Sequence, residues 1–285
     1  MNSVFVDDVW NKQFIQNGFI ILKNAISIDF DKNYSFFNSL ESNVDNKFYT
    51  SLWSSNQEYR ILVDTKIKEI LTPVCDKYLN NYHPFFSDLL VKKPSLTHRL
   101  NWHQDWTFTD EEKYTQVFLW MPLQKVTKQN GCIMLLPKSH QYFQAIRGTN
   151  IPSGLNYSKL NEFEKKYAQY IELERGDILV LNQSLLHASL PNRSFNNRLA
   201  LGLYCLPENA PVYHYHYDIL TNKILKYEID QEFIFKLSSN QDFKYSIMEQ
   251  KMPRPIGKII EEVELADSKY DVDFYLKYEE QLKHK

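Results

Sequence analysis

Eight short segments in the middle of the chain constrain its fold most. Each is an apolar or alternating run of strand length, and turn signals such as Asn130-Gly131 and Gly176-Asp177 separate several of them. The segments cover residues 85–91, 97–105, 116–123, 132–136, 169–173, 178–182, 199–206 and 212–217. About eight short strands at this spacing predict a β-sandwich or a jelly roll.

The regions on either side of these segments follow a helical pattern. Residues before 80 alternate polar and apolar positions at roughly helical spacing, with one β-like interruption at 18–22. The best helix candidate is 58–82, where Pro73 is expected to kink or end the helix. Shorter helices are predicted at 158–168 and 271–284.

The chain is expected to form a single domain. Its 285 residues, 43% of them hydrophobic, suffice for one large core, and no repeat or composition break marks a second unit. Within 1–285 we expect a largely helical part at 1–84, the strand-rich core at 85–217, and a C-terminal extension at 218–285 that wraps the barrel.

Charge and cysteine content exclude several classes of partner and location. A net charge of −2 and a pI near 6.5 favour neither nucleic acid nor an anionic membrane. The three cysteines are far apart and are expected to be buried free thiols in a reducing compartment. With no apolar run of membrane-spanning length and with Asp7 and Asp8 where a signal peptide would be basic and apolar, we expect a cytoplasmic protein. The oligomeric state is not predicted.

Two histidines and one aspartate are candidate metal ligands. His103 and Asp105 stand two residues apart in a segment predicted to be extended, so their side chains would share one face. His187 closes the apolar run that follows Gly176. Two imidazoles and one carboxylate form the ligand set that holds iron(II) and leaves coordination positions open. A surface His bonded to a carboxylate would be the simpler explanation of His103 alone.

A candidate anion anchor follows the second histidine. Arg198 comes 11 residues after His187 (198 − 187) and begins another apolar run. A guanidinium there could hold a carboxylate through two parallel hydrogen bonds, although an ordinary salt bridge at a strand edge is the alternative.

In combination these residues resemble the phytanoyl-CoA dioxygenase family of iron(II)/2-oxoglutarate oxygenases. His103 and Asp105 match the family's first two iron ligands, and His187 matches the third. Ser189 and Arg198 match the residues that bind the distal carboxylate of 2-oxoglutarate. Three further stretches resemble family signatures, and the resemblance runs from about 14 to about 206: Asn130-Gly131-Cys132, Pro137-Lys138-Ser139-His140 and the opening at 14–24.

The resemblance implies a fold and a reaction. The fold would be mainly β with flanking helices (α+β), a double-stranded β-helix or cupin-like jelly roll with N-terminal helices packed on it. The reaction would be hydroxylation of a small-molecule C–H bond with Fe(II), O2 and 2-oxoglutarate, which is decarboxylated to succinate and CO2. Asp105 disfavours halogenation, because related halogenases lack this carboxylate, whereas desaturation and cyclisation stay open.

Several further residues are assigned to the site region. Trp120 stands near a position where the family often has Trp, and would contact the cosubstrate or be an ordinary core aromatic. Some family members use a Lys from the N-terminal region, but the nearest candidate, Lys47, matches poorly and stays unassigned. Residues 141–158 are a candidate lid or, equally, a solvated insertion.

The substrate contacts are predicted from position only. Arg99 and Asn101 share the strand parity of His103, so they are expected to face the same cavity. Trp106 and Arg147 lie beside the ligands and in the candidate lid. The four residues could contact a polar or acidic small molecule.

The remaining histidines are expected to be structural. His140 is expected to bond to backbone, and His214 and His216 belong to an aromatic strand without a nearby third ligand. Two other functions remain as alternatives. A zinc hydrolase would need a general base and no Arg198. A non-catalytic metabolite-binding barrel should have lost a metal ligand or Arg198, and neither is lost.

Overall fold

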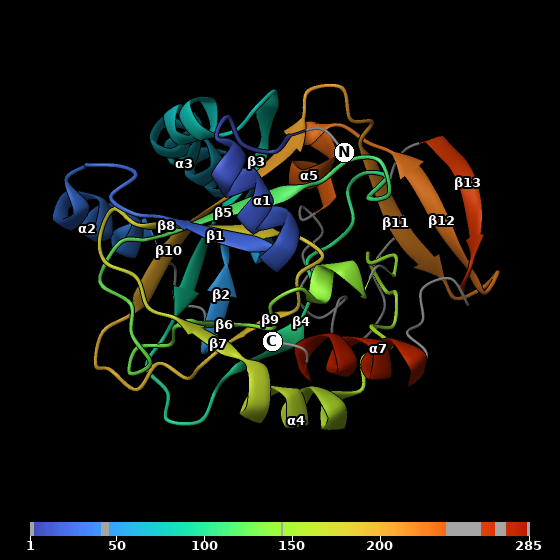
Figure 1. The fold of residues 1–285 in the computed structure, drawn as a ribbon. Helices are drawn as coiled ribbons and strands as arrows, with labels where there is room; N and C mark the ends of the chain where they lie inside the picture. The colour runs from blue at the N-terminus through green and yellow to red at the C-terminus, as the bar shows by residue number, and fades with distance from the viewer. Residues whose placement is uncertain (1–2, 41–45, 144, 238–257, 266–271, 284–285) are drawn as a thin grey trace.

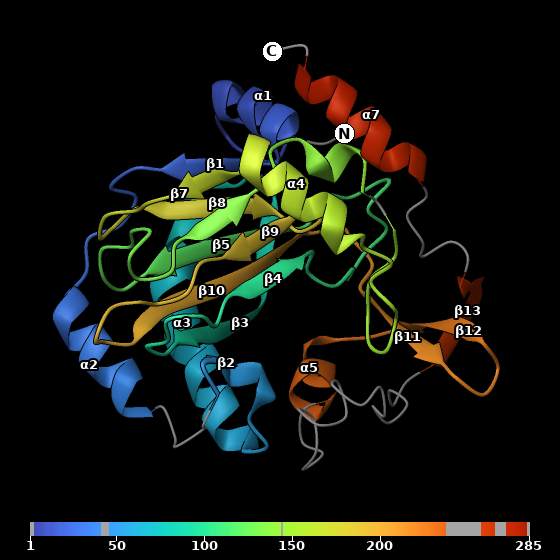
Figure 2. The same cartoon turned by 90° about the horizontal axis from the view of Figure 1, so that it is seen from below.

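Two antiparallel sheets face each other and form the jelly roll that the strand pattern predicted (Figures 1 and 2). The computed structural model describes residues 3–40, 46–143, 145–237, 258–265 and 272–283. The major sheet has the order β1-β8-β5-β10-β3-β2 and the minor sheet the order β4-β9-β6-β7. The strands are β1 (Phe19–Leu22), β2 (Phe48–Thr50), β3 (Tyr82–Lys92), β4 (Leu100–His103), β5 (Val117–Pro122), β6 (Ile133–Leu135), β7 (Gln169–Ile171), β8 (Ile178–Asn182), β9 (His187–Ser189) and β10 (Arg198–Pro207).

Three N-terminal helices cover the outer face of the major sheet, as Figure 1 shows. They are α1 (Asp8–Asn17), α2 (Phe30–Leu40) and α3 (Gln57–Tyr78), and a short 3-10 turn, η1 (Ser51–Trp53), precedes α3. Outward-facing residues such as Leu89 and Leu201 pack with Ile67 and Leu71 of α3 in one core cluster. The helix predicted at 58–82 is confirmed as α3, which ends earlier, at Tyr78, and Pro73 lies inside it and does not end it.

The space between the two sheets holds a second, aromatic core. Alternation along β3 turns Phe86 and Leu90 inward while Leu89 faces the helices. Tyr204 of β10 is stacked between Phe86 (ring centroids 4.1 Å apart) and Phe118 of β5 (4.3 Å). This stack forms part of the interior surface onto which the site opens.

Two helices cover the outer face of the minor sheet, and Figure 2 shows them side by side. α4 (Tyr157–Tyr167) and α7 (Val272–Lys283) pack together through Phe163 and Tyr278. The Tyr278 hydroxyl donates to the Pro137 carbonyl oxygen at 2.8 Å. A 3-10 turn, η2 (Ser139–Gln141), lies nearby in the chain.

A third sheet stands beside the jelly roll (Figure 2). It contains β11 (Tyr213–Asp218), β12 (Lys223–Glu228) and β13 (Lys258–Glu264), and α5 (Gln231–Leu237) contacts α3 and β3. Of the predicted C-terminal extension, 238–257, 266–271 and 284–285 lie outside the described residues. Among the described helices none has the length and apolarity to cross a bilayer. Cys75, Cys132 and Cys205 are buried free thiols, as predicted.

Candidate metal centre

The three predicted metal ligands converge on one point between the sheets. His103 ends β4, His187 begins β9, and the two residues are paired across these strands. With Asp105 they offer three ligand atoms that all lie within 4.8 Å of one another. The imidazole centroids are 4.1 Å apart, and His187 Nε2 lies 3.9 Å from Asp105 Oδ1. This spacing suits a metal ion bound by two imidazoles and a carboxylate.

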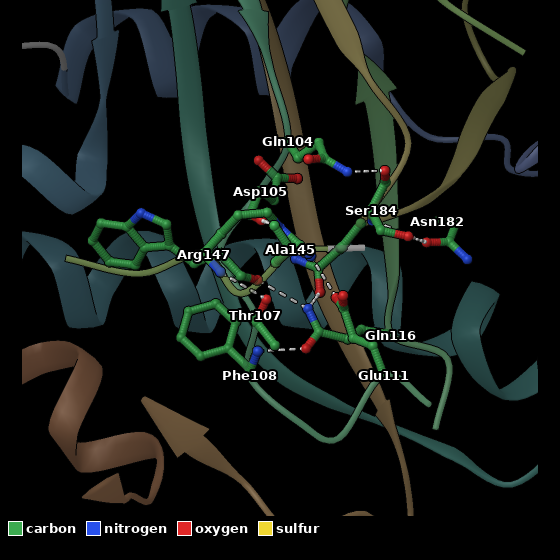
Figure 3. Close-up of polar contacts among 12 residues, drawn as sticks. Gln104, Asp105, Thr107, Phe108, Glu111, Gln116, Ala145, Arg147, Asn182 and Ser184 are labelled. Atoms are coloured by element: carbon green, nitrogen blue, oxygen red, sulfur yellow. Dashed lines mark hydrogen bonds and ion pairs between the residues drawn. The ribbon is translucent and has the colours of Figure 1, made fainter. Parts of the chain in front are cut away.

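Asp105 is held at this point by a loop, whereas it was expected to lie on the same strand as His103. β4 ends at His103, so Asp105 lies in the following loop. Its backbone N–H donates to the Gln183 carbonyl oxygen at 3.2 Å, and its own carbonyl oxygen accepts from Arg147 Nε at 2.7 Å (Figure 3). Between the two ligands, Gln104 Nε2 donates to the Phe143 and Ser184 carbonyl oxygens. Loop contacts therefore place the carboxylate beside the imidazoles.

Each imidazole is oriented by a backbone carbonyl. His103 Nδ1 lies 2.7 Å from the Asn101 carbonyl oxygen, and His187 Nδ1 lies 3.0 Å from that of Leu185. With the proton on Nδ1, each Nε2 keeps its lone pair for a metal. Burial lowers the pKa of both histidines to about 4, and the charge of His187 adds to the shift of His103, so both rings are neutral near pH 7.

The carboxylate of the set is short of partners. Asp105 Oδ2 is buried and has no hydrogen-bond partner among the described residues. Burial is also the largest cause that raises its pKa. A buried carboxylate oxygen without a donor is unusual, and a cation at this point would satisfy it.

A cavity of about 300 Å³ opens from the three ligands toward the major sheet. Ser189, Trp120 and Arg198 line it together with the ligands. The Arg198 guanidinium carbon lies 5.2 Å from the Trp120 ring centroid, and Nε has no hydrogen-bond partner in the described part of the chain. Burial lowers the pKa of Arg198 to about 10, so the side chain stays cationic near pH 7. The salt bridge considered as an alternative is absent among the described residues.

A lysine that the sequence did not single out stands directly behind this anchor. Lys92 is paired with Arg198 across β3 and β10, and its Nζ donates to Ser189 Oγ (2.5 Å) and to the Ser189 carbonyl oxygen (3.3 Å). Burial, then the charge of Arg198, lowers the pKa of Lys92 to about 6. The sequence feature that could have identified Lys92 is a charged residue at a position of β3 that faces the interior. Lys47 does not line the cavity.

The predicted substrate contacts divide into one inside the cavity and three outside it. Trp106 lines the cavity. Arg99 binds Glu164 of α4 (Nη2–Oε2 2.7 Å), and Asn101 is exposed. Because the pairing of β4 with β9 shifts register between Leu100 and His103, the shared-face expectation for Arg99 and Asn101 does not hold.

Arg147 supports the site from behind. Besides the Asp105 carbonyl, it binds the Ala145 carbonyl oxygen (Nη1, 2.7 Å) and the carboxylate of Glu111 (Nη2–Oε1, 2.5 Å), as Figure 3 shows. It does not line the cavity. Its guanidinium is thus occupied by protein groups, and it holds the loop of Asp105 in place.

The candidate lid lies outside the cavity lining. No described residue of 141–158 lines the cavity, and Thr149 is joined to the third sheet through its N–H to Tyr215 O (2.9 Å) and its carbonyl oxygen from Tyr217 N–H (3.0 Å). The structural role expected for His140 is confirmed, because its Nε2 lies 3.0 Å from the Ile15 carbonyl oxygen. His214 and His216 lie in β11, as expected, and both contact the Thr149 hydroxyl.

Comparison with known proteins supports the family resemblance. The phytanoyl-CoA dioxygenase (PhyH) family model matches residues 16–200. A phytanoyl-CoA dioxygenase domain-containing protein 1 homolog of Dictyostelium discoideum is 33% identical over 132 residues, 44% of this chain and 47% of the relative. A phytanoyl-CoA dioxygenase of Arabidopsis thaliana is 29% identical over 125 residues, 42% and 43% of the two chains. The chain thus spans about half the length of the curated relatives it matches.

Solved structures share the fold. The non-heme alpha ketoglutarate dependent carbocyclase SnoK from nogalamycin biosynthesis superposes with a TM-score of 0.52 at 16% identity, over 91% of this chain and 95% of SnoK. HygX from Streptomyces hygroscopicus, solved with nickel and 2-oxoglutarate, gives 0.50 at 12% identity over 72% and 88%. At these identities the likeness concerns the fold. On the match over 16–200, the chain belongs to the phytanoyl-CoA dioxygenase family.

Proposed function

We propose that this protein is an iron(II)- and 2-oxoglutarate-dependent dioxygenase that hydroxylates a C–H bond of a small molecule. The observation that carries the proposal is that one cavity contains, within the described part of the chain, both a carboxylate oxygen without a hydrogen-bond donor and a guanidinium without an anion. A His-Asp-His set with an unpartnered carboxylate oxygen lies at one position, and the buried Arg198 without a carboxylate partner among the described residues lies at another. A metal ion and a dicarboxylate would satisfy both.

The donor set fits iron(II). His103, Asp105 and His187 would hold the ion, with both Nε2 atoms available and the carboxylate already buried beside them. Iron with 2-oxoglutarate and O2 supplies oxidising power by converting 2-oxoglutarate to succinate and CO2. Three protein ligands leave coordination positions for these cosubstrates. Because Asp105 occupies a ligand position, we propose hydroxylation rather than halogenation, and desaturation or cyclisation would use the same ligands.

The chain's own groups would seat the cosubstrate. The guanidinium of Arg198 would bind the distal carboxylate of 2-oxoglutarate, and Trp120 would hold the guanidinium plane from one side. Lys92 donates to Ser189 Oγ, which leaves the serine proton free to be donated to the same carboxylate. Because these groups are buried, water competes little for the bond and the electrostatic attraction is stronger than at a surface.

The location is proposed on separate grounds. Three buried unpaired cysteines suit the reducing environment of a cytoplasm.

The proposal is tested by absorption spectroscopy without oxygen. Mixing the protein with iron(II) and 2-oxoglutarate should produce a visible metal-to-ligand charge-transfer band, because a 2-oxo acid chelates the iron. His103→Ala should abolish the band, since two protein ligands hold iron poorly. Arg198→Ala should raise the Kd for 2-oxoglutarate roughly 10- to 100-fold, the loss expected for a charged hydrogen bond.

The control variant keeps the band. Arg175→Ala removes an exposed cation paired with Asp31 (2.7 Å), far from the cavity lining, and should leave the titration unchanged. A wild-type protein that gives no band, or an Arg198→Ala protein with unchanged affinity for 2-oxoglutarate, would contradict the proposal.

A further inference from the structure

The inner face of β3 carries two charged residues of opposite sign. Lys92 and Asp88 are four positions apart, so both face the interior and their Cα atoms are roughly 13 Å apart along the strand. Lys92 pairs with Arg198, and Asp88 pairs with Gly202 on the same strand, β10. The cationic end is the proposed cosubstrate seat. The anionic end, which also lines the cavity, has no role in that seat.

Asp88 is buried with one oxygen unsatisfied. Asp88 is only 1% exposed, and its Oδ2 accepts a hydrogen bond from the Thr50 hydroxyl. Oδ1 has no hydrogen-bond partner among the described residues. Burial raises the pKa of Asp88 to about 7, and the charge of Asp105 adds to the shift. A carboxyl oxygen kept from water without a donor destabilises the folded protein, and a donor group of a ligand would supply the missing hydrogen bond.

The carboxylate of Asp88 packs directly on the backbone of Gly202, and the residue lines the cavity. A Cβ added at Gly202 would lie 2.7 Å from Asp88 Oδ1 and 2.6 Å from Phe118 Cε2. Any larger residue would therefore press on the Asp88 carboxylate and the Phe118 ring and force them to shift. The bond to Thr50 explains one oxygen as a structural anchor, and close packing on the Gly202 backbone explains the glycine, but neither supplies a donor to Oδ1.

The walls of the cavity are largely aromatic and aliphatic. Six of the lining side chains are Trp53 of η1, Phe86 and Tyr204 of the major sheet, Trp106 and Phe108 of the loop after β4, and Ile234 of α5. Rings of this kind favour an apolar body and also attract a cation over their faces. Asp105 and Asp88 line the same cavity, so a molecule bound at Asp88 shares that cavity with the candidate metal.

We propose that Asp88 is a substrate-binding residue, and that the substrate is a compact, mainly apolar molecule carrying a hydrogen-bond donor, an amine or a hydroxyl, that binds Asp88 Oδ1. That the bound molecule is a substrate rests on the proposed function, whereas its binding to Asp88 requires only the cavity. It changes the expectation from sequence, in which arginines beside the metal ligands favoured a polar or acidic molecule.

Binding of small probes tests the assignment. Calorimetric titrations under anaerobic conditions, with and without iron(II) and 2-oxoglutarate, would use phenethylamine, 2-phenylethanol, ethylbenzene and 3-phenylpropanoate. We expect a donor probe to bind roughly 10- to 100-fold more tightly than ethylbenzene, and the preferred donor distinguishes an amine from a hydroxyl substrate. Asp88→Asn should remove most of that preference for an amine, and Asp88→Leu should remove it for both donors.

Two further variants complete the design. Asp76→Asn removes a carboxylate from the exposed side of α3 and serves as the charge-matched control, with probe binding unchanged. Gly202→Ala keeps the charge but presses a methyl group against Oδ1 and the Phe118 ring, so a variant that a thermal melt shows to be folded should bind the donor probes more weakly because the carboxylate is displaced.

Four results would overturn the role of Asp88. They are no binding by either donor probe, equal binding of ethylbenzene, tighter binding of 3-phenylpropanoate, and donor binding unchanged in both Asp88 variants. A missing charge-transfer band counts only against the proposed function, because probe binding is measured separately.

Discussion

At the residue scale, we expect Lys92 to lower the stability of the fold and to strengthen the binding of 2-oxoglutarate. Its ammonium is buried behind Ser189 and Arg198, and its pKa falls from 10.5 to about 6. Lys92→Met should therefore raise the free energy of unfolding by about 1–3 kcal/mol. The same change should raise the Kd for 2-oxoglutarate roughly 10-fold or more, because Ser189 loses its donor and the seat loses a charge. Thermal melts and anaerobic titrations measure the two effects.

The pH dependence of both effects has a defined sign. Between pH 6 and 10.5 the unfolded chain keeps a proton on Lys92 that the folded chain has lost, so this residue makes the free energy of unfolding rise with pH over that window. A bound carboxylate raises the pKa of Lys92 again, so 2-oxoglutarate binding takes up a proton and weakens as pH rises above 6. Lys92→Met should lose this residue's share of both slopes, whereas the exposed control Lys128→Met should keep it. Identical slopes in wild type and Lys92→Met would rule out this account.

At the element scale, the loop after β4 controls the metal site. Strand pairing aligns the two histidines, but Asp105 depends on Arg147, whose Nε holds its carbonyl oxygen at 2.7 Å. Arg147→Ala should lower iron(II) affinity about 10- to 100-fold, as for other groups that orient a ligand. Arg147→Lys should recover little, because one ammonium cannot reach the Asp105, Ala145 and Glu111 oxygens together.

The measurement is an iron(II) titration beside a thermal melt. The melt shows whether the variant is folded, and the titration shows whether the carboxylate is still in place. Arg175→Ala, which breaks an exposed ion pair, should match wild type in both. A folded Arg147→Ala protein with wild-type iron affinity would show that Asp105 is held by other contacts.

At the scale of the whole molecule, sequence predicted what local pattern encodes. The strand predicted at 178–182 matches β8 (Ile178–Asn182), and the long helix and the buried thiols were also predicted. β2 and β9, each only three residues long, were missed, because so few positions show little alternation. The longer β12 and β13 were missed as well, because their segments are rich in lysine and glutamate.

The site was predicted through its motif, and its surroundings were not. Lys92 contacts Ser189, which lies 97 positions away in the chain, and Asp88 is paired with Gly202 of another strand. Arg99 and Arg147 were expected to bind ligand, yet each is paired with a glutamate, Glu164 and Glu111, that lies 65 or 36 positions away. Such pairings follow from the folded chain's topology, and no local pattern in a single sequence contains them.

The two-sheet arrangement leads to a prediction about the melting of the whole protein. The ligands His103 and His187 sit on the minor sheet and Arg198 on the major sheet, so iron(II) with 2-oxoglutarate would join the two layers. A ligand that binds only the folded state at about 100 times its Kd adds about 2.7 kcal/mol, which raises the melting temperature by roughly 5–10 °C. In anaerobic melts Arg198→Ala should keep the increment from iron and lose that from 2-oxoglutarate, and a chelator should remove both. If 2-oxoglutarate stabilised the Arg198→Ala protein as much as wild type, the cosubstrate would be held by one sheet alone.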